Sequence, residues 1–269
     1  MLLDYLYGWL LYESSLRWIV ALQENKISVL KTAAMYFSYL GYFEAYVVIL
    51  IILFNFLDRD VAFYFIFASS IGIYVDPWFK LLYHQPRPFY TDAKIKAWEC
   101  DYEYGNPAGD SFFFAFFYLT LILYYFYDGS AQHQWLRSST SFETVCCVIY
   151  VVGALMLGFS EFYVGAHTAD QIIYGWTLGI WLALALHEFL RKPFKKHIEW
   201  LLTPYACLSG EIKYGKLFCN ATLLFLLATL MFVFSYLILT YRVVTPASWV
   251  DQLVQKCGYN PSTQSHLAF

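Results

Sequence analysis

Long apolar runs alternate with short polar stretches along most of the sequence. Several of these runs are about 17–25 residues long, the length that an α-helix needs to cross ~30 Å of hydrocarbon. A backbone inside lipid must pair its polar groups within its own segment, so we expect helices rather than strands. The predicted spans are residues 33–57, 61–83, 111–127, 144–160, 171–190 and 217–241.

The pattern divides the chain into a membrane domain and two flanking segments. Residues 1–32 begin with an apolar run that charged residues interrupt, which predicts an amphipathic helix in the membrane interface, with an additional span as the alternative. Residues 33–241 form the six-span domain. Residues 242–269 have too few apolar positions to fold alone, and we expect this tail to dock on a partner protein. The fold class is therefore an all-α integral membrane protein.

Composition strengthens the membrane interpretation. Apolar residues make up 60% of the chain and charged residues 14%, against roughly 45–50% and about 25% in soluble domains. These values exclude a disordered chain. The 17 basic and 20 acidic residues give a net charge of −3, which argues against nucleic acid as a partner. Membrane lipids and protein subunits are the expected partners.

Alternation of the spans places residues 84–110, residues 161–170 and both termini on one side of the membrane, which we call face A. A basic cluster at 191–196 lies on the opposite side. The positive-inside rule then makes face A luminal or external, with the endoplasmic reticulum and the mitochondrial inner membrane as candidate locations. Cys100 and Cys257 both fall on face A and could pair if that face is oxidising. The cysteines lack metal-binding spacing, and no metal or cofactor is predicted.

Three polar patches interrupt the apolar chain at face A. The first runs from Lys80 to Pro88, the second from Asn106 to Ser111, and the third from Ser160 to His167. Helix ends that converge on one side of a bundle build polar pockets. We therefore expect the three patches to share one pocket.

In this order the patches resemble the motifs K-x6-R-P, P-S-G-H and S-R-x5-H-x3-D of the type-2 phosphatidic acid phosphatase superfamily, which includes glucose-6-phosphatase and vanadium haloperoxidases. The resemblance covers roughly residues 33–190. It implies a histidine that attacks phosphorus, a second histidine that protonates the leaving oxygen, and a cradle that binds the phosphoryl oxygens. The matching positions are Lys80, Arg87, Pro88, Pro107, Gly109, Ser160 and His167.

By the resemblance, His167 is the nucleophile position and Asp110 stands at the second histidine. The phosphate-binding equivalents are Lys80, Arg87, Ala108, Gly109, Ser160 and Glu161. The sequence departs from the family at four of its motif positions, which carry Ala108 for serine, Asp110 for histidine, Glu161 for arginine and Gln171 for the terminal aspartate.

The departures change the charge of the predicted pocket. Lys80 and Arg87 now face Asp110 and Glu161, so these four positions sum to about zero. Unpaired cations in a partly desolvated pocket are costly, so we expect the two acids to neutralise them in a structural ion-pair network.

This charge balance favours a catalytically degenerate phosphatase-like protein with a structural or assembly role, as an accessory subunit of a larger membrane complex. The alternative is an active membrane phosphatase that hydrolyses a lipid phosphate or a sugar phosphate through a phosphohistidine on His167, with Asp110 as a substitute acid. A lipid-binding module that uses the pocket without hydrolysis is the second alternative.

Overall fold

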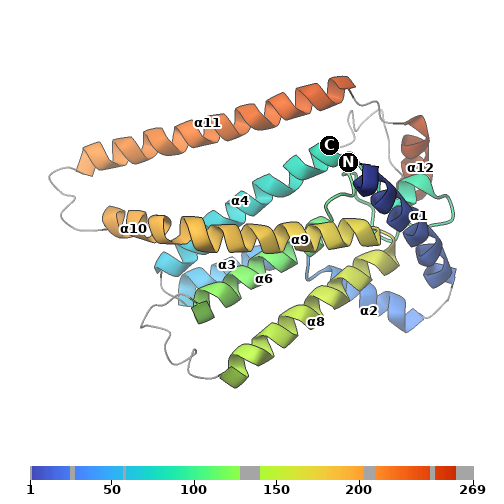
Figure 1. Cartoon of the computed structure of the whole chain (residues 1–269), viewed down its shortest axis with the longest axis horizontal. Coiled ribbons are helices and arrows are strands. Elements are labelled where there is room, and N and C mark those ends of the chain that lie inside the picture. Colours follow the sequence, from blue (N-terminus) through green and yellow to red (C-terminus); the bar gives the residue numbers. More distant parts are fainter. Residues whose placement is uncertain are drawn as a thin grey trace.

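The computed structural model describes residues 2–24, 28–56, 59–127, 140–202, 210–242 and 246–258. Within these ranges the regular elements are all helical, which confirms the all-α prediction. Figure 1 shows a bundle of long helices with several shorter helices gathered at one end. That end carries α1 and α12, and it is the end at which the polar patches meet.

Two central helices, α6 (Gly109–Tyr127) and α9 (Ala169–Ala185), pack closely enough that glycine is required between them. A Cβ atom added at Gly175 would lie 2.6 Å from the Ala108 carbonyl oxygen, and one at Gly179 would lie 2.5 Å from the Phe112 carbonyl oxygen. Small residues permit this close approach of backbones in membrane bundles. The contact fixes the start of α6 beside the start of α9.

Aromatic side chains fill the interior around these two helices. Phe65 of α4 (Arg59–Tyr83) and Phe112 and Phe116 of α6 are fully buried. Tyr46 of α3 (Phe43–Phe56) joins the same cluster and packs edge-on against Phe117. Burial of such rings contributes most of the packing energy of this core.

The first predicted span, 33–57, is not one continuous helix. It is divided between α2 (Ser28–Ser38) and α3, with a turn at residues 39–42. Gly41 lies in that turn, and a Cβ atom there would lie 2.4 Å from the Asp110 Cβ. The turn at residues 39–42 therefore packs directly against the first turn of α6. A side chain at position 41 would prevent this contact.

Four helices are long and apolar enough to cross a membrane within the described residues. They are Val61–Thr91, Gly109–Tyr127, Ser141–Val164 and Ala169–His197. The last of these joins α9 to α10 (Arg191–Leu202) through a π-helical turn, η2 (Leu186–Leu190). A shorter apolar stretch, Thr222–Leu237, lies within α11 (Gly210–Arg242).

The outward faces of α8 (Thr140–Val164) and α11 are apolar. Ile149 is 65% exposed and Leu224 is 67% exposed. Because exposed faces of this kind are stable in lipid and not in water, the chain is an integral membrane protein.

The helices at face A that lie outside the central bundle form a second buried cluster. Tyr12, Leu16 and Ile19 of α1 (Leu2–Glu24) pack with Phe89 of α5 (Pro88–Thr91) and Leu253 of α12 (Ala247–Cys257). The α12 helix thus lies on its own chain. The docking of the wider tail, 242–269, on a partner stays a prediction, and residues 259–269 lie outside the described residues.

Candidate functional site

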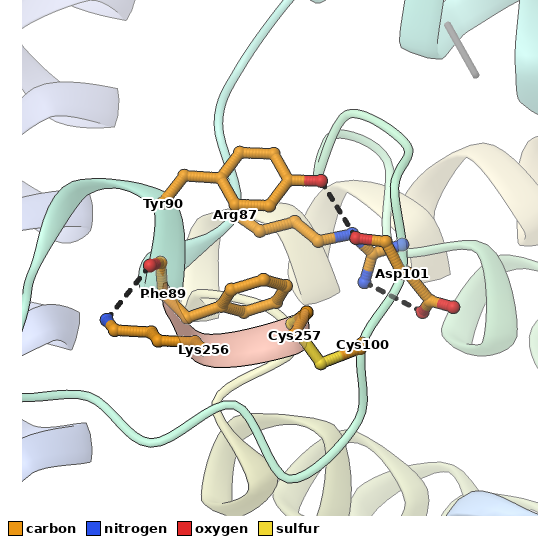
Figure 2. The surroundings of a disulfide bond; sticks show 7 residues. All are labelled: Arg87, Phe89, Tyr90, Cys100, Asp101, Lys256 and Cys257. Carbon is orange, nitrogen blue, oxygen red and sulfur yellow. Dashed lines mark hydrogen bonds and ion pairs between the residues drawn. A yellow bond between two sulfur atoms is a disulfide. The ribbon is translucent and has the colours of Figure 1, made fainter. Parts of the chain in front are cut away.

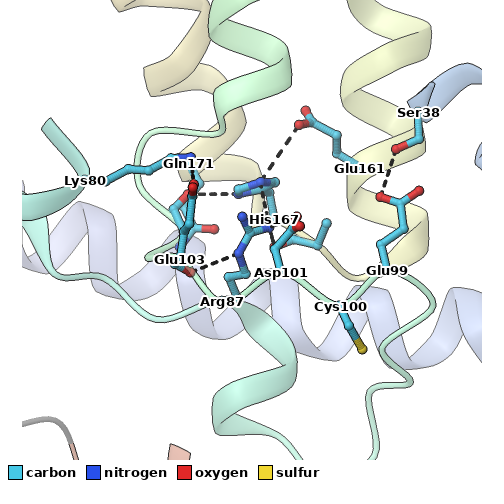
Figure 3. A network of polar contacts seen from close by, with 12 residues as sticks. Ser38, Lys80, Arg87, Glu99, Cys100, Asp101, Glu103, Glu161, His167 and Gln171 are labelled. Carbon is cyan, nitrogen blue, oxygen red and sulfur yellow. Dashed lines mark hydrogen bonds and ion pairs between the residues drawn. The ribbon is translucent and has the colours of Figure 1, made fainter. Parts of the chain in front are cut away.

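The three polar patches meet at face A. Lys80 lies in the last turn of α4, Arg87 is the N-cap of α5, and Asp110 lies in the first turn of α6. Glu161 lies near the end of α8, and His167 follows in the turn before α9. Figure 3 shows His167 between Arg87 and Glu161.

The turn after α8 returns the chain toward the pocket. Gly165 has a φ of 78°, which non-glycine residues rarely adopt. The amide of Ala166 donates to the Glu161 carbonyl oxygen at 3.0 Å, which ends α8 in the manner of a glycine C-cap. This turn places the His167 side chain inside the bundle end.

His167 is 3% exposed, and both ring nitrogens have partners. Nδ1 lies 2.8 Å from the Gly105 carbonyl oxygen, which can only accept, so Nδ1 carries the proton. Nε2 lies 3.1 Å from Arg87 Nη1, which can only donate. Burial, with Arg87 and Lys80 nearby, holds the pKa of His167 well below its ordinary value. The imidazole is therefore neutral, and its lone pair is directed at Arg87.

Lys80 pairs with two carboxylates. Its Nζ lies 3.1 Å from Asp76 Oδ2 and 2.6 Å from Glu103 Oε2. Asp76 precedes it by one turn of α4, and Glu103 comes from the loop between α5 and α6. Burial raises the pKa of Glu103, but the charge and hydrogen bond of Lys80 outweigh it, so the pKa lies below its usual value. The pair is therefore ionised at neutral pH.

Arg87 is surrounded by acceptors. Nη1 lies 3.2 Å from Asp101 Oδ2, and Nε donates to the Glu103 carbonyl oxygen at 3.0 Å. The Ala166 carbonyl oxygen lies 3.5 Å from Nη1, in addition to the contact with His167. The guanidinium is thus occupied by the protein itself.

We expected Asp110 and Glu161 to pair with Lys80 and Arg87, and this prediction is wrong about which acids form the pairs. Asp110 and Glu161 are not the acids that lie within ion-pair distance of Lys80 and Arg87; Asp76, Asp101 and Glu103 are. The physical reason is that helix spacing already gives Lys80 an acid at i−4, and the loop folds its own acids over the pocket. The network exists, with other members.

Glu161, at the family's arginine position, faces the nucleophile position without bonding to it. Its Oε1 lies 3.9 Å from His167 Nε2 and has no hydrogen-bond partner, while Oε2 accepts a hydrogen bond from the Ser111 hydroxyl. The residue is fully buried. A carboxyl group therefore lies where the resemblance places a cation.

The remaining motif positions have structural contacts. The Ser160 hydroxyl donates to the Ala34 carbonyl oxygen. The Ala108 amide donates to the Gln171 carbonyl oxygen at 3.2 Å. Gln171 Nε2 donates to the Pro86 carbonyl oxygen at 2.9 Å and Oε1 accepts from the Thr168 amide. Gly109 lies beside Lys80, since a Cβ atom there would be 3.1 Å from Nζ.

Sequence reasoning missed several members of this site. Asp76 could have been found from its i−4 spacing to Lys80. Asp101, Glu103 and Gly105 gave no such signal, because only the fold of the loop brings them to the cations. The same loop carries the predicted Cys100–Cys257 pair, which is bonded in the structure, as Figure 2 shows.

An apolar cavity of about 250 Å³ opens between α2 and α8, next to this site. Ser160 is one of its lining residues and directly precedes Glu161 of the polar site. The other lining residues are Leu30, Ala33, Ala34, Phe37, Leu155, Met156 and Phe159.

Comparisons with known proteins agree with this architecture. A scan against protein-family models matches the PAP2 superfamily over residues 60–195, just over half of the chain. A transmembrane PAP2-type phosphatidylglycerolphosphate phosphatase from Bacillus subtilis has a solved structure that superposes with a TM-score of 0.55 at 18% identity. The match covers 72% of this chain and 94% of that chain, and it shows a shared fold. No curated protein matches the sequence. With its three motif regions gathered at one end of a transmembrane bundle, the chain belongs to the PAP2 superfamily.

Proposed function

We propose that the protein is a catalytically degenerate PAP2 member with a structural or assembly role, as an accessory subunit of a larger membrane complex. The observation that carries this proposal is the internal pairing of the two retained cations. A phosphate group would have to displace Asp101 from Arg87 and Glu103 from Lys80. It would then lie beside the Glu161 carboxyl group.

The catalytic groups that this chain lacks contribute strongly to the rate of phosphoryl transfer. Loss of a general acid typically lowers the rate by ~10²–10⁴, and loss of one stabilising donor costs about 2.7–4 kcal/mol. Here Asp110 replaces the family's second histidine and Glu161 replaces its arginine. Both changes remove a group that would have stabilised the developing negative charge.

A specific observation favours the alternative, an active membrane phosphatase acting on a lipid phosphate or a sugar phosphate. His167 is neutral and its Nδ1 is positioned by the Gly105 carbonyl oxygen, which leaves Nε2 as the nucleophilic atom. In this alternative Arg87 must first release Nε2, to which it donates a hydrogen bond.

Phosphate release from lipid and soluble phosphomonoesters by the purified full-length protein distinguishes the two. We expect no release above that of His167→Ala. The Bacillus subtilis phosphatase with its own substrate, in the same detergent, is the positive control. Turnover by the wild-type chain that disappears in His167→Ala would establish the active phosphatase instead.

The assembly role has its own test. Purification of the tagged protein from native membranes in a mild detergent should recover partner chains at fixed stoichiometry. A chain that migrates alone, at the mass of one protomer with its detergent, would contradict the role as a subunit.

The cavity between α2 and α8 favours a lipid-binding function as the second alternative. Its walls are apolar and it lies beside a helix whose outer face is lipid-exposed. Ala33→Trp should fill the cavity and remove lipid that co-purifies with the protein, as measured by native mass spectrometry. Leu224→Trp, on the exposed face of α11, is the matched control, and equal lipid content in both variants would argue against this function.

A further inference from the structure

Residues 99–103 form an acidic segment whose carboxylates all point back into the protein. Glu99 accepts a hydrogen bond from Ser38 at 2.9 Å, Asp101 pairs with Arg87, and Glu103 pairs with Lys80. Figure 3 shows Glu99 beside Ser38, and Asp101 and Glu103 near Arg87. The segment thus presents anions to each of the two buried cations.

The acids approach from the solvent side. The side chains of Asp101 and Glu103 are 58% and 52% exposed, whereas those of Arg87 and Lys80 are 3% and 9% exposed. The two carboxylates therefore lie at the mouth of the pocket, with the cations beneath them. An oxyanion that entered from solvent would meet the same two cations along the same path.

Several contacts anchor the segment in this position. The disulfide joins Cys100, between two of the acids, to Cys257 at the end of α12. Lys256 donates to the carbonyl oxygens of Phe89 and Asp92 at 3.0 Å and 2.6 Å, which attaches α12 to the base of the loop. The Tyr90 hydroxyl donates to the Asp101 carbonyl oxygen at 2.8 Å. Figure 2 shows the Lys256–Phe89 and Tyr90–Asp101 contacts around the bridge.

We propose that the Lys80–Arg87 pocket is still an oxyanion-binding site, and that its ligand in this chain is the chain's own segment 99–103, fastened there by the Cys100–Cys257 bridge. The carboxylates of Asp101 and Glu103 take the places of phosphoryl oxygens. The segment excludes phosphate compounds for as long as it is fastened. This inference rests on the proposed function in one respect, namely that the cations serve no substrate in the resting protein.

The test uses the full-length protein in detergent with inorganic phosphate as the probe. Asp101→Asn/Glu103→Gln removes both carboxylate charges and keeps the side-chain shapes. Asp92→Asn/Asp251→Asn removes the same charge from face A at positions away from Lys80 and Arg87. Calorimetry should show phosphate binding by the first variant at least tenfold tighter than by the wild type or the second variant.

Thermal unfolding gives a second measurement, because two partly unpaired cations could weaken the fold of the first variant. Phosphate should raise the Tm of Asp101→Asn/Glu103→Gln, since a ligand that binds the folded state stabilises it. The added substitution Arg87→Gln should abolish that increase. Equal responses to phosphate in the wild type and in all variants would overturn the inference.

A third variant tests the bridge. Cys100→Ser/Cys257→Ser keeps every carboxylate but removes the link between the segment and α12. Its phosphate affinity should lie between those of the wild type and Asp101→Asn/Glu103→Gln. An affinity equal to that of the wild type would show that the disulfide does not hold the segment over the cations.

Phosphate release, measured on the same proteins, separates this inference from the proposed function. Binding without release in Asp101→Asn/Glu103→Gln supports both. Release by that variant alone would support the internal ligand and overturn catalytic degeneracy. Release by the wild type, with equal phosphate affinity in wild type and variant, would overturn both.

Discussion

The two nitrogens of His167 have opposite hydrogen-bonding roles, which fixes the protonation state of the ring. Nδ1 donates to the Gly105 carbonyl oxygen and Nε2 accepts from Arg87. A proton added to Nε2 would have to displace the guanidinium hydrogen bond and would place two cations 3.1 Å apart. The residue is therefore buried in its neutral form, and this has a consequence for stability.

The pKa of His167 is depressed in the folded protein, so the unfolded chain binds the extra proton more readily. Stability contributed by the neutral ring is present above the ordinary histidine pKa of about 6.5 and is lost as pH falls below it. The wild type should lose Tm between pH 7.5 and pH 5.5, and His167→Gln should lose less. Parallel declines in the two proteins would show that other groups cause the effect.

The two carboxylates on Lys80 differ in burial, and their energetic contributions should differ accordingly. Asp76 is 7% exposed and Glu103 is 52% exposed. Lys80→Met leaves Asp76 as an uncompensated buried charge and should cost about 3–5 kcal/mol. Glu103→Gln should cost roughly 1 kcal/mol or less, because half-exposed pairs are weak.

Denaturant or thermal unfolding in detergent would measure both values. The double variant Lys80→Met/Asp76→Asn should recover much of the loss, because it removes the buried charge as well. No recovery in the double variant would mean that Lys80 stabilises the fold by something other than its pairing with Asp76.

At the scale of the elements, the contact between α6 and α9 holds the site together. The backbone of Ala108, at a motif position, lies against Gly175. A change in this contact would move the start of α6 relative to His167. It would do so through packing alone, without removing a hydrogen-bonding group of the site.

Gly175→Ala should therefore destabilise the protein by about 1–3 kcal/mol, the usual cost of overpacking. The new Cβ would lie 2.6 Å from the Ala108 carbonyl oxygen, which is backbone and cannot rotate away. Gly72→Ala is the matched control, because its nearest neighbour is the Phe116 ring at 3.0 Å, a side chain that can adjust. Equal Tm values for the two variants would indicate that α9 can shift away from α6.

Elements and site were predictable from sequence to different degrees. The long apolar runs predicted α4, α6, α8 and α9, because membrane helices are specified by length and hydropathy. The break at residues 39–42 was not predicted, since the apolar run continues through it and the contact between Gly41 and Asp110 is tertiary. For the same reason the motifs located Lys80, Arg87 and His167 but gave no indication of the acids on the loop.

At the scale of the whole molecule, the bridge between Cys100 and Cys257 bears on the side of the membrane that the site faces. Disulfides persist in oxidising compartments, which supports a luminal or external location for face A. The loop, α12 and the pocket would then all face that compartment.

Labelling with a membrane-impermeant maleimide tests this placement in sealed vesicles of known orientation. In a background in which Cys146, Cys147, Cys207 and Cys219 are replaced by serine, Cys100 and Cys257 should react from the luminal or external side, and only after reduction of the bridge. Labelling that requires access from the cytosolic side would reverse the assignment.

The same bridge also limits how the chain can be threaded through the bilayer. Two cysteines can bond only if they emerge on the same side, so the polypeptide between them must traverse the bilayer an even number of times. Among the described helices, α6, α8 and the continuous helix through α9 and α10 are long and apolar enough for three passages. The candidate for the fourth passage is α11. Its 33 residues are long enough to cross the bilayer, although its described apolar stretch is short. The sulfur–sulfur bond thus supports a passage by α11, the helix that the apolar run 217–241 predicts.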